Sequence, residues 1–394
     1  MTVREACPGT GQTDWKQPVQ LACFALVFAQ ATYLAAAYWF GSWLGAIPTD
    51  FASVWAAGRL VLQGQPEAAY DWPIHKQIEA LAVGHPFDGY FGWHYPPSFL
   101  LVAAALALLP FTAAYGLWLA GTFPLYLGAI RAIVGERSGY VLAAAFPAVL
   151  SNFMVGQNGF LSAALLGGGL VLLADGPILA GFCFGLLTFK PQLGLLIPIA
   201  LIAGGYWRTF ITAGIVALLM AAASWGAFGT TTWAAFDANI GHTGQAFLSD
   251  GWADFGKLQT AFGLTRMLGG SVSLAWVIQI ALALVAAAAI AALWRSRAAF
   301  ELKAAALGAA TLLATPYLYT YDLVVLAVPL AFLFRLGRLG GFLPGELSGI
   351  GVACLLILIF PAVKAPVGFA AVLIVSALVV RRAWRPYGNH VAMQ

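Results

Sequence analysis

Long apolar runs recur along the chain and are separated by short polar turns. They fall near residues 19–45, 95–110, 112–133, 139–155, 157–174, 177–206, 209–227, 272–294, 303–316, 322–335, 346–361 and 366–381. The runs are continuous in Ala, Leu, Val and Phe, which is typical of helices in lipid and not of the alternating strands of a membrane barrel. The pattern predicts an all-α, polytopic integral membrane protein with about 12 transmembrane helices.

Composition supports this class. The chain has 394 residues, of which 61% are hydrophobic and 9% charged, whereas soluble domains carry about 25% charged residues. No internal repeat or soluble domain interrupts the pattern, so we expect one membrane-embedded domain over residues 1–394. The cysteines are scattered, the histidines lack metal-ligand spacing, and no nucleotide-binding motif is present. The sequence therefore predicts no metal, no other cofactor and no nucleic-acid partner.

Basic residues indicate the cytoplasmic side of a membrane protein. They occur at both ends of the chain and in several turns between apolar runs, namely Arg4, Lys16, Arg208, Arg295, Arg297, Lys303, Arg335, Arg338, Arg381, Arg382 and Arg385. This distribution predicts both termini on the cytoplasmic side of the membrane and two long external loops, 46–94 and 228–270. Arg131 and Arg137 fall outside under this count. Lys190-Pro191 interrupts run 177–206, which we interpret as a single broken helix.

The first external loop begins with a lone carboxylate, Asp50, directly after the first apolar run. Helical spacing of the apolar residues that follow it predicts a short amphipathic helix in the membrane interface, with Arg59 off its apolar face. A second such helix is expected at 74–83, and Pro96-Pro97 in FGWHYPP is expected to start the next helix. Asp50 follows Pro-Thr and precedes a helix, so it fits an N-cap as well as a catalytic carboxylate.

Four further stretches place polar residues within or beside apolar runs, where burying a polar group in the membrane costs free energy. A charge near the middle of a membrane is a functional candidate by default, and Lys190 in LLTFKPQLGLL is such a charge. The others are His94 and Tyr95 in FGWHYPP, Gln157 in MVGQNGF, and Tyr321 and Asp322 in TPYLYTYD. Simpler interpretations are a lysine extending to the interface, a satisfied interfacial histidine, a tight glycine turn, and an aromatic belt with a helix cap. Segment 236–259 fits a substrate lid or a connector.

The order of these stretches resembles a known class. PTDFASVWAAGRLVLQGQPEAAYD, WHYPPSFLLVAAALALLP, VGQNGFLSAALL, GLLTFKPQLGLLIP and ATPYLYTYDLVVLAVP are similar to segments of the GT-C class of membrane glycosyltransferases. Within it they resemble the family of the mycobacterial phosphatidylinositol-mannoside mannosyltransferase, glycosyltransferase family 87. Mannosyl-transferring members tend to have histidine near the last motif, where this chain has Tyr-Thr-Tyr-Asp, so the donor sugar stays open.

The resemblance implies an inverting hexosyltransferase without cofactors, with Asp50 as general base. It also implies a polyprenyl-phosphate sugar as donor, a lipid or glycan as acceptor, membrane lipids as surroundings, and a site on the periplasmic or exterior face of a bacterial plasma membrane. On physical grounds we assign Lys190 to the donor phosphate. Candidates for further sugar or phosphate contacts are Gln157, His94, Tyr95, Arg59, Tyr321 and Asp322.

Two other functions fit parts of the pattern. A transporter or lipid flippase would explain Lys190 and the broken helix without catalysis, but no repeated halves are visible and the polar features gather on the outer side. A non-enzymatic scaffold of an envelope-polymer complex would use the external loops only to bind partners. Sugar transfer from a polyprenyl-phosphate donor distinguishes an enzyme from both.

Overall fold

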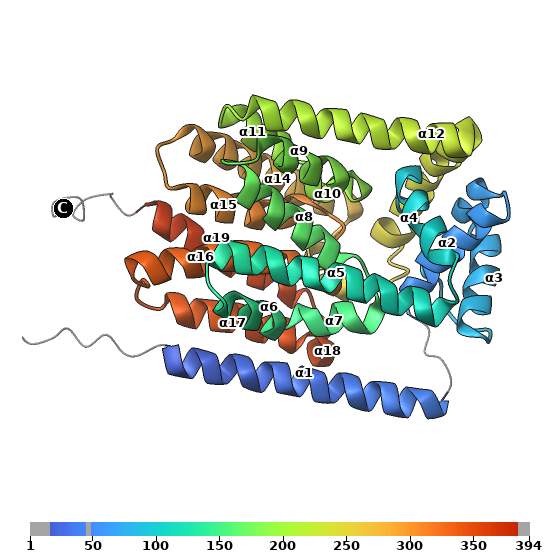
Figure 1. Cartoon of the computed structure of the whole chain (residues 1–394), viewed down its shortest axis with the longest axis horizontal. Coiled ribbons are helices and arrows are strands. Elements are labelled where there is room, and N and C mark those ends of the chain that lie inside the picture. The colour runs from blue at the N-terminus through green and yellow to red at the C-terminus, as the bar shows by residue number, and fades with distance from the viewer. Residues whose placement is uncertain (1–15, 45–48, 385–394) are drawn as a thin grey trace, which may run out of the picture.

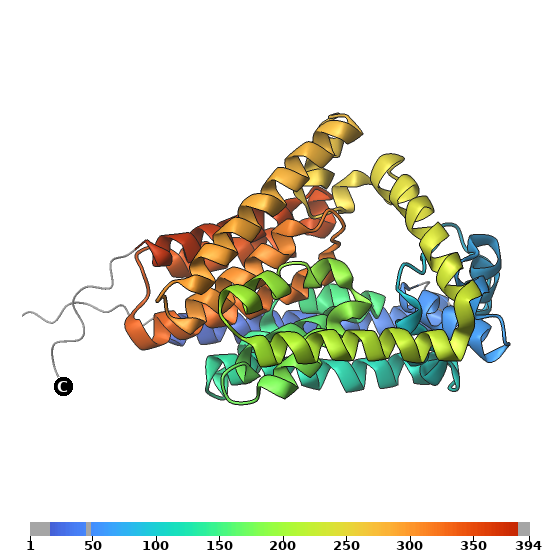
Figure 2. The same cartoon turned by 90° about the horizontal axis from the view of Figure 1, so that it is seen from above.

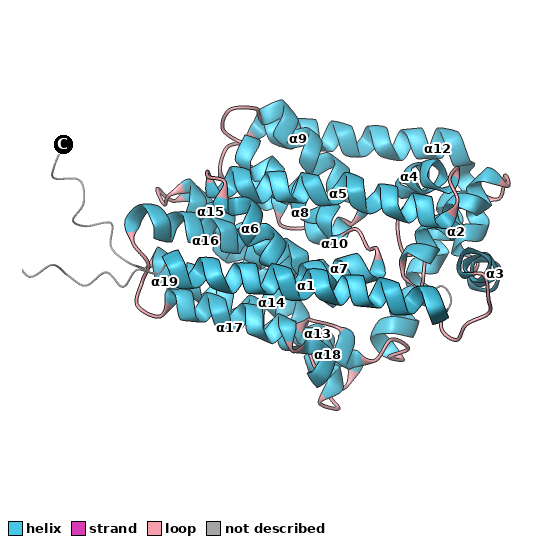
Figure 3. Cartoon of the chain, turned by 60° about the horizontal axis from the view of Figure 1, so that its bottom comes forward, coloured by secondary structure: helices cyan, strands magenta, loops and turns pink. Residues whose placement is uncertain are grey.

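The computed structural model describes residues 16–44 and 49–384, and within this part all regular elements are helices (Figures 1 and 3). The N-terminal half contains α1 (Lys16–Leu44), α2 (Phe51–Leu62), η1 (Pro66–Tyr70), α3 (Trp72–Val83), α4 (Pro97–Ala107), α5 (Phe111–Val134), α6 (Ser138–Ala145), α7 (Ala148–Val155), α8 (Gly159–Leu172), α9 (Pro177–Leu186), η2 (Leu187–Phe189), α10 (Pro191–Gly194) and α11 (Ile197–Ala203). The C-terminal half contains α12 (Trp207–Thr243), η3 (Gly244–Ser249), η4 (Phe255–Lys257), α13 (Ala261–Met267), α14 (Val272–Arg295), α15 (Phe300–Ala314), η5 (Thr320–Leu326), α16 (Ala327–Gly340), α17 (Glu346–Leu358), α18 (Phe360–Val363) and α19 (Val367–Ala383). The all-helical membrane class is confirmed.

The described helices that are long enough to span a membrane are fewer than predicted. Five segments of the described part are long and apolar enough to cross a bilayer: Lys16–Trp39, Phe111–Val134, Trp207–Ser249, Val272–Arg295 and Thr320–Gly340. A sixth is obtained if α6 and α7, which meet at 66°, form one bent span. The other apolar helices have 10–17 residues, shorter than the roughly 20 residues that a bilayer core requires. The expected count of about 12 is therefore not confirmed.

The predicted span at 95–110 is not confirmed. The helix there, α4, has 11 residues, fewer than the roughly 20 that a bilayer core requires. Before it, the Tyr95 carbonyl accepts a hydrogen bond from Tyr70 of η1 at 2.9 Å, and after it the Leu109 carbonyl accepts one from Trp55 of α2 at 2.9 Å. The Phe111 ring lies 5.8 Å from the Phe51 ring, also on α2. Both ends of α4 therefore lie beside α2, at the same end of the molecule (Figure 1).

The segment 177–203 folds back at Lys190 and is not one broken helix. Pro191 cannot donate a backbone hydrogen bond, so helical structure is interrupted there, and Lys190 is the non-helical residue between η2 and α10. The carbonyl of Pro177 accepts a hydrogen bond from Thr209 near the start of α12, and Gly204 lies against Trp294 at the end of α14. Both ends of the segment therefore lie at the end of the bundle opposite Lys190.

Basic residues gather at that opposite end. Ion pairs join Arg338 to Glu136, Arg335 to Glu301 and Arg382 to Glu346. Since Arg131 and Arg137 flank Glu136 in sequence, they belong to the same end as the other basic turns. The predicted topology places Arg131 and Arg137 on the outer side, whereas in the structure they lie at the same end of the bundle as Glu136 and its partner Arg338. Arg4 and Arg385 lie outside the described residues.

The first loop forms both expected helices, but α2 is more buried than an interfacial helix. Its buried residues lie on nearly all faces: Phe51, Ala52, Ser53, Val54, Ala56, Ala57, Gly58 and Leu60. A Cβ at Gly58 would lie 2.0 Å from the Ala103 carbonyl oxygen, so α2 packs directly on the backbone of α4. Protein therefore covers α2, and it holds Asp50 rigidly at its N-terminus.

The second predicted loop, 228–270, is largely helical. α12 continues to Thr243 across a kink at Gly229, whose φ of 76° is a conformation that glycine adopts readily. Figure 2 shows how the chain changes direction in α12 before it approaches the C-terminal helices. The last part of α12 is attached to the first loop, because Asn239 accepts a hydrogen bond from Trp72 at 2.7 Å and donates one to the Trp93 carbonyl at 3.1 Å. The segment therefore forms a wall and not a free connector.

Candidate active site

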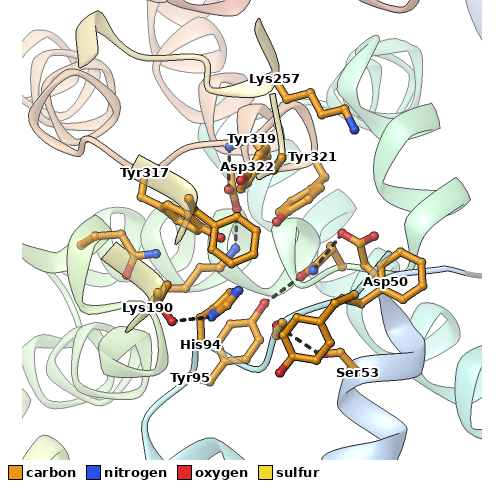
Figure 4. A pocket seen from close by; sticks show the side chains of 18 of the residues that line it. Asp50, Ser53, His94, Tyr95, Lys190, Lys257, Tyr317, Tyr319, Tyr321 and Asp322 are labelled. Atoms are coloured by element: carbon orange, nitrogen blue, oxygen red, sulfur yellow. Dashed lines mark hydrogen bonds and ion pairs between the residues drawn. The ribbon is translucent and has the colours of Figure 1, made fainter. Parts of the chain in front are cut away.

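A cavity of about 1030 Å³ opens where the first loop meets the ends of several helices (Figure 4). Its walls come from the start of α2, the loop before α4, the turn between α7 and α8, the break at Lys190, the last part of α12 with the segment after it, and η5. Seven of the eight candidates line it: Asp50, His94, Tyr95, Gln157, Lys190, Tyr321 and Asp322. Their roles stay predictions, but the fold brings them together from stretches as far apart as residues 50 and 322.

Asp50 does not cap α2 through its side chain. It occupies the N-cap position, but its carboxylate makes no capping hydrogen bond. Instead, Oδ2 accepts a hydrogen bond from Gln157 Nε2 at 3.2 Å, and Oδ1 has no hydrogen-bond partner among the described residues. The sequence left capping and catalysis open for this residue. The orientation of the carboxylate favours a role in the cavity.

A chain of hydrogen bonds fixes the partner of this carboxylate. Tyr70 donates to the Tyr95 carbonyl at 2.9 Å, and the Tyr95 hydroxyl donates to Gln157 Oε1 at 2.8 Å. Because its Oε1 accepts from Tyr95, Gln157 presents Nε2 to Asp50. Gly156 makes the turn possible: its φ is 68°, and a Cβ there would lie 2.3 Å from the Tyr115 ring. The glycine turn and the polar site are therefore the same feature.

Burial gives Asp50 a proton affinity suited to a base. Desolvation raises the pKa of Asp50 from 3.8 to about 6, against the Gln157 hydrogen bond, which lowers it. The negative charges of Glu79 and Asp322 raise this pKa further, and the positive charge of Lys257 lowers it. A carboxylate with a pKa near neutrality is a stronger base than an ordinary aspartate and is still ionised at pH 7.

His94 is neutral in this cavity. Burial and, to a lesser extent, the neighbouring His75 lower the pKa of His94 to about 3. Its Nδ1 lies 3.0 Å from Thr243 Oγ1 on α12, so one ring nitrogen is engaged in joining the two walls. His94 can therefore offer a hydrogen bond to a substrate, but not a positive charge to a phosphate.

Lys190 lies in the cavity wall as a member of a buried ion pair. Its Nζ donates to Asp322 Oδ1, and both side chains are about 95% buried. Asp322 Oδ2 accepts a hydrogen bond from the Tyr319 amide at 3.1 Å, which caps η5. A buried lysine requires such a partner, because an unpaired charge in a low-dielectric interior is costly. Asp322 therefore caps η5, as the simpler interpretation expected, and it also lines the cavity.

Arg59 is the one candidate that does not line the cavity. Its guanidinium carbon lies 5.5 Å from the centre of the Trp55 ring, one turn earlier on α2. A cation–π contact on the outer side of α2 explains the residue without a substrate.

Several lining residues were missed by the sequence reasoning. On α12 they are Phe236, Asn239, Ile240 and Thr243, whose spacing of three, four and seven residues marks one helical face. That spacing could have indicated a structured wall in place of a loop. Lys257 and Trp252 also line the cavity. No local pattern distinguishes these two from ordinary loop residues.

No group of three or more His, Cys, Asp or Glu side chains that could hold a metal is present among the described residues.

Comparison with known proteins identifies the family. Neither the curated proteins nor the solved structures contain a significant match to the chain. The family model described as glycosyltransferase family 87 matches residues 93–316, more than half of the chain, including the loop before α4, the Gln157 turn, Lys190 and the wall from α12. The chain therefore belongs to glycosyltransferase family 87.

Proposed function

We propose that this protein is an inverting glycosyltransferase that moves a hexose from a polyprenyl-phosphate sugar to a hydroxyl of a lipid or glycan acceptor. One observation carries the proposal: the Asp50 carboxylate faces a large cavity, with one oxygen held by Gln157 and the other without a hydrogen-bond partner in the part of the chain that the structure describes. Family membership supports glycosyl transfer. Asp50 lies before the matched range, so geometry alone connects it to the reaction.

The proposed reaction is a single displacement. The acceptor oxygen attacks the anomeric carbon while the bond from that carbon to the phosphate oxygen breaks, and the hydroxyl proton passes to Asp50. The sugar is then bonded to the acceptor, the leaving group is a polyprenyl phosphate with one more negative charge, and Asp50 is protonated. General-base assistance of this kind contributes about 10²–10⁴-fold to a rate. Attack opposite the leaving group inverts the anomeric configuration.

The Lys190–Asp322 pair can assist the leaving group only in part. An ammonium has three N–H donors, so Lys190 can bind Asp322 and still donate to a phosphate oxygen. Our sequence-based assignment of Lys190 to the donor phosphate stays a prediction on this basis. Its positive charge, however, is already balanced by Asp322.

The cavity faces the exterior in this proposal. The basic turns lie at the opposite end of the bundle, joined by the pairs of Arg335, Arg338 and Arg382, and basic residues favour the cytoplasm. With α4 confined to the outer side and the segment around Lys190 passing in and back, the number of passages remains about 12. Reporter fusions at residues 90 and 250 should then report outside, and one at residue 136 should report inside.

The decisive assay is transfer by the purified protein. A panel of polyprenyl-phosphate hexoses, a lipid extract as acceptor and matching nucleotide sugars as control donors would be supplied, with NMR of the new linkage to determine its configuration. We expect transfer with inversion from one or more of the polyprenyl donors and none from nucleotide sugars. Transport without transfer would favour a carrier, and direct use of a nucleotide sugar would contradict the proposed donor class.

A further inference from the structure

We propose that Lys257 is the residue that balances the charge of the donor phosphate and holds the phosphate of the departing lipid. This inference rests on the proposed function, because it concerns the polyprenyl-phosphate donor of the same cavity. It goes beyond the motifs of the sequence, which gave no reason to select Lys257.

The position of Lys257 supports this role. It lines the same cavity as Asp50 although it comes from a different wall, the short η4 segment after α12. In Figure 4 its side chain extends over the cavity on the side where Tyr321 and Asp50 lie. Its ammonium makes no ion pair or hydrogen bond with any described residue. Lys257 thus offers a cation to an incoming anion without first breaking a contact.

The backbone under Lys257 is fixed, so its position is defined. Asp254 accepts a hydrogen bond from the Gly256 amide at 3.0 Å. A Cβ at Gly256 would lie 2.2 Å from the Lys364 carbonyl oxygen, so the segment packs tightly on the turn before α19. The backbone N–H of Gln259 donates a hydrogen bond to the Leu318 carbonyl at 2.8 Å, and the side-chain Oε1 of Gln259 accepts one from the Gly368 backbone N–H at 2.7 Å. Only the flexible lysine side chain has to move to reach a ligand.

The charges of the cavity lead to the same residue. Its lining includes three carboxylates, Asp50, Asp88 and Asp322, and two ammonium groups, Lys190 and Lys257. Lys190 and Asp322 compensate each other, which leaves Lys257 as the positive charge available to a ligand in this lining. A donor phosphodiester carries one negative charge, and its leaving group gains a second as the glycosidic bond breaks. A cation at Lys257 therefore stabilises the transition state more than the bound donor.

Binding at Lys257 also affects the base. The Lys257 charge lowers the pKa of Asp50, whereas the charges of Glu79 and Asp322 raise it. The single negative charge of a bound phosphodiester offsets the positive charge of Lys257 and so removes its lowering effect on this pKa. The donor should therefore make Asp50 more basic when the reaction is about to occur.

The test compares a ligand with and without phosphate. Binding of a long-chain polyprenyl phosphate and of the corresponding polyprenol to the purified full-length protein would be followed by tryptophan fluorescence, since Trp252 lines the cavity. Wild type, Lys257→Gln and Lys257→Arg would be compared with Lys364→Gln, which removes an exposed lysine charge beside the same segment but outside the cavity lining.

We expect Lys257→Gln to weaken binding of the phosphate by about 10- to 100-fold, the range of a charge-assisted hydrogen bond, and to leave binding of the alcohol unchanged. Lys257→Arg should restore most of the loss, and Lys364→Gln should bind both ligands like wild type. Equal loss for phosphate and alcohol, or no loss for the phosphate, overturns the inference. Transfer by wild type is measured separately, so a failure of the proposed function remains distinguishable from a failure at Lys257.

Discussion

Replacing Asp50 by asparagine should make the protein more stable and nearly inactive. The substitution keeps the size of the side chain and an oxygen that can accept the Gln157 hydrogen bond of 3.2 Å. It removes the charge and the capacity to take a proton. A side chain that merely completed the fold would lose stability on substitution, so the two changes together identify a functional carboxylate.

The stability gain follows from the raised pKa. The pKa of Asp50 is about 6 in the folded protein and 3.8 ordinarily, a difference of about 2.2 that corresponds to roughly 3 kcal/mol at 1.36 kcal/mol per unit. Because Asp50 is half-buried and partly screened, about 1–2 kcal/mol is the working value. The folded state holds the proton more tightly than the unfolded state, so wild type loses this stability as pH rises from about 4 to above 6.

The asparagine variant does not titrate and escapes this loss. At pH 7.5 its melting temperature in detergent should exceed that of wild type by about 1–2 °C, and near pH 4 the difference should vanish. Wild-type kcat/KM should fall about tenfold per pH unit below about pH 6, where Asp50 becomes protonated. The variant should transfer about 10²–10⁴-fold more slowly, without that acid limb. Near-normal transfer by a folded Asp50→Asn protein would remove the proposed base, and lower stability at pH 7.5 would refute the desolvation reasoning.

Three further substitutions probe the parts that position the site. Tyr95→Phe deprives the buried Gln157 Oε1 of its 2.8 Å donor, so kcat/KM should fall by about 5- to 100-fold and the melting temperature by about 1–3 °C; normal kinetics would show that Gln157 orients itself. Gly58→Ala places a Cβ 2.0 Å from a carbonyl of α4 and should destabilise the fold by about 1–3 kcal/mol, measured as a lower melting temperature in detergent. Asp322→Asn leaves Lys190 as an uncompensated buried charge and should cost about 3–5 kcal/mol; a monodisperse protein of normal melting temperature would show that solvent reaches the lysine.

Local patterns were sufficient for many elements of the fold. Helical spacing after Asp50 and Pro96-Pro97 located α2 and the start of α4, and the interruption at Lys190-Pro191 located the break between η2 and α10. These features depend on residues close in sequence, such as a proline that lacks an N–H. Whether a segment crosses or returns depends instead on its partners. α4 looks like a span because it is apolar, but it is apolar because α2 packs against it.

In the candidate site, too, single residues could be selected from local sequence, whereas the contacts between them could not. Gln157 could be selected because its glycine turn is visible in the sequence, and Asp50 because it ends an apolar run. The hydrogen bond that joins them spans 107 residues and has no local signature. The wall from α12 was interpreted as a loop because its glycines and polar residues resemble a connector, whereas tertiary hydrogen bonds from Asn239 to the first loop fix it.

The free-energy cost of a charge in the membrane marks a position as important but does not by itself specify the role of the residue. A lysine within an apolar segment attracts notice because an isolated charge there is expensive. The same expense requires a partner, and Lys190 has one in Asp322. A lysine that must capture an anion has the opposite requirement: its charge has to be free before the ligand arrives, so water must solvate it and no carboxylate can neutralise it. Lys257, exposed at the cavity and unpaired among the described residues, meets that requirement. Lys190 is thus charge-balanced by Asp322, whereas Lys257 has no charged partner among the described residues, and this difference is the reason why we propose Lys257 as the group that balances the donor phosphate.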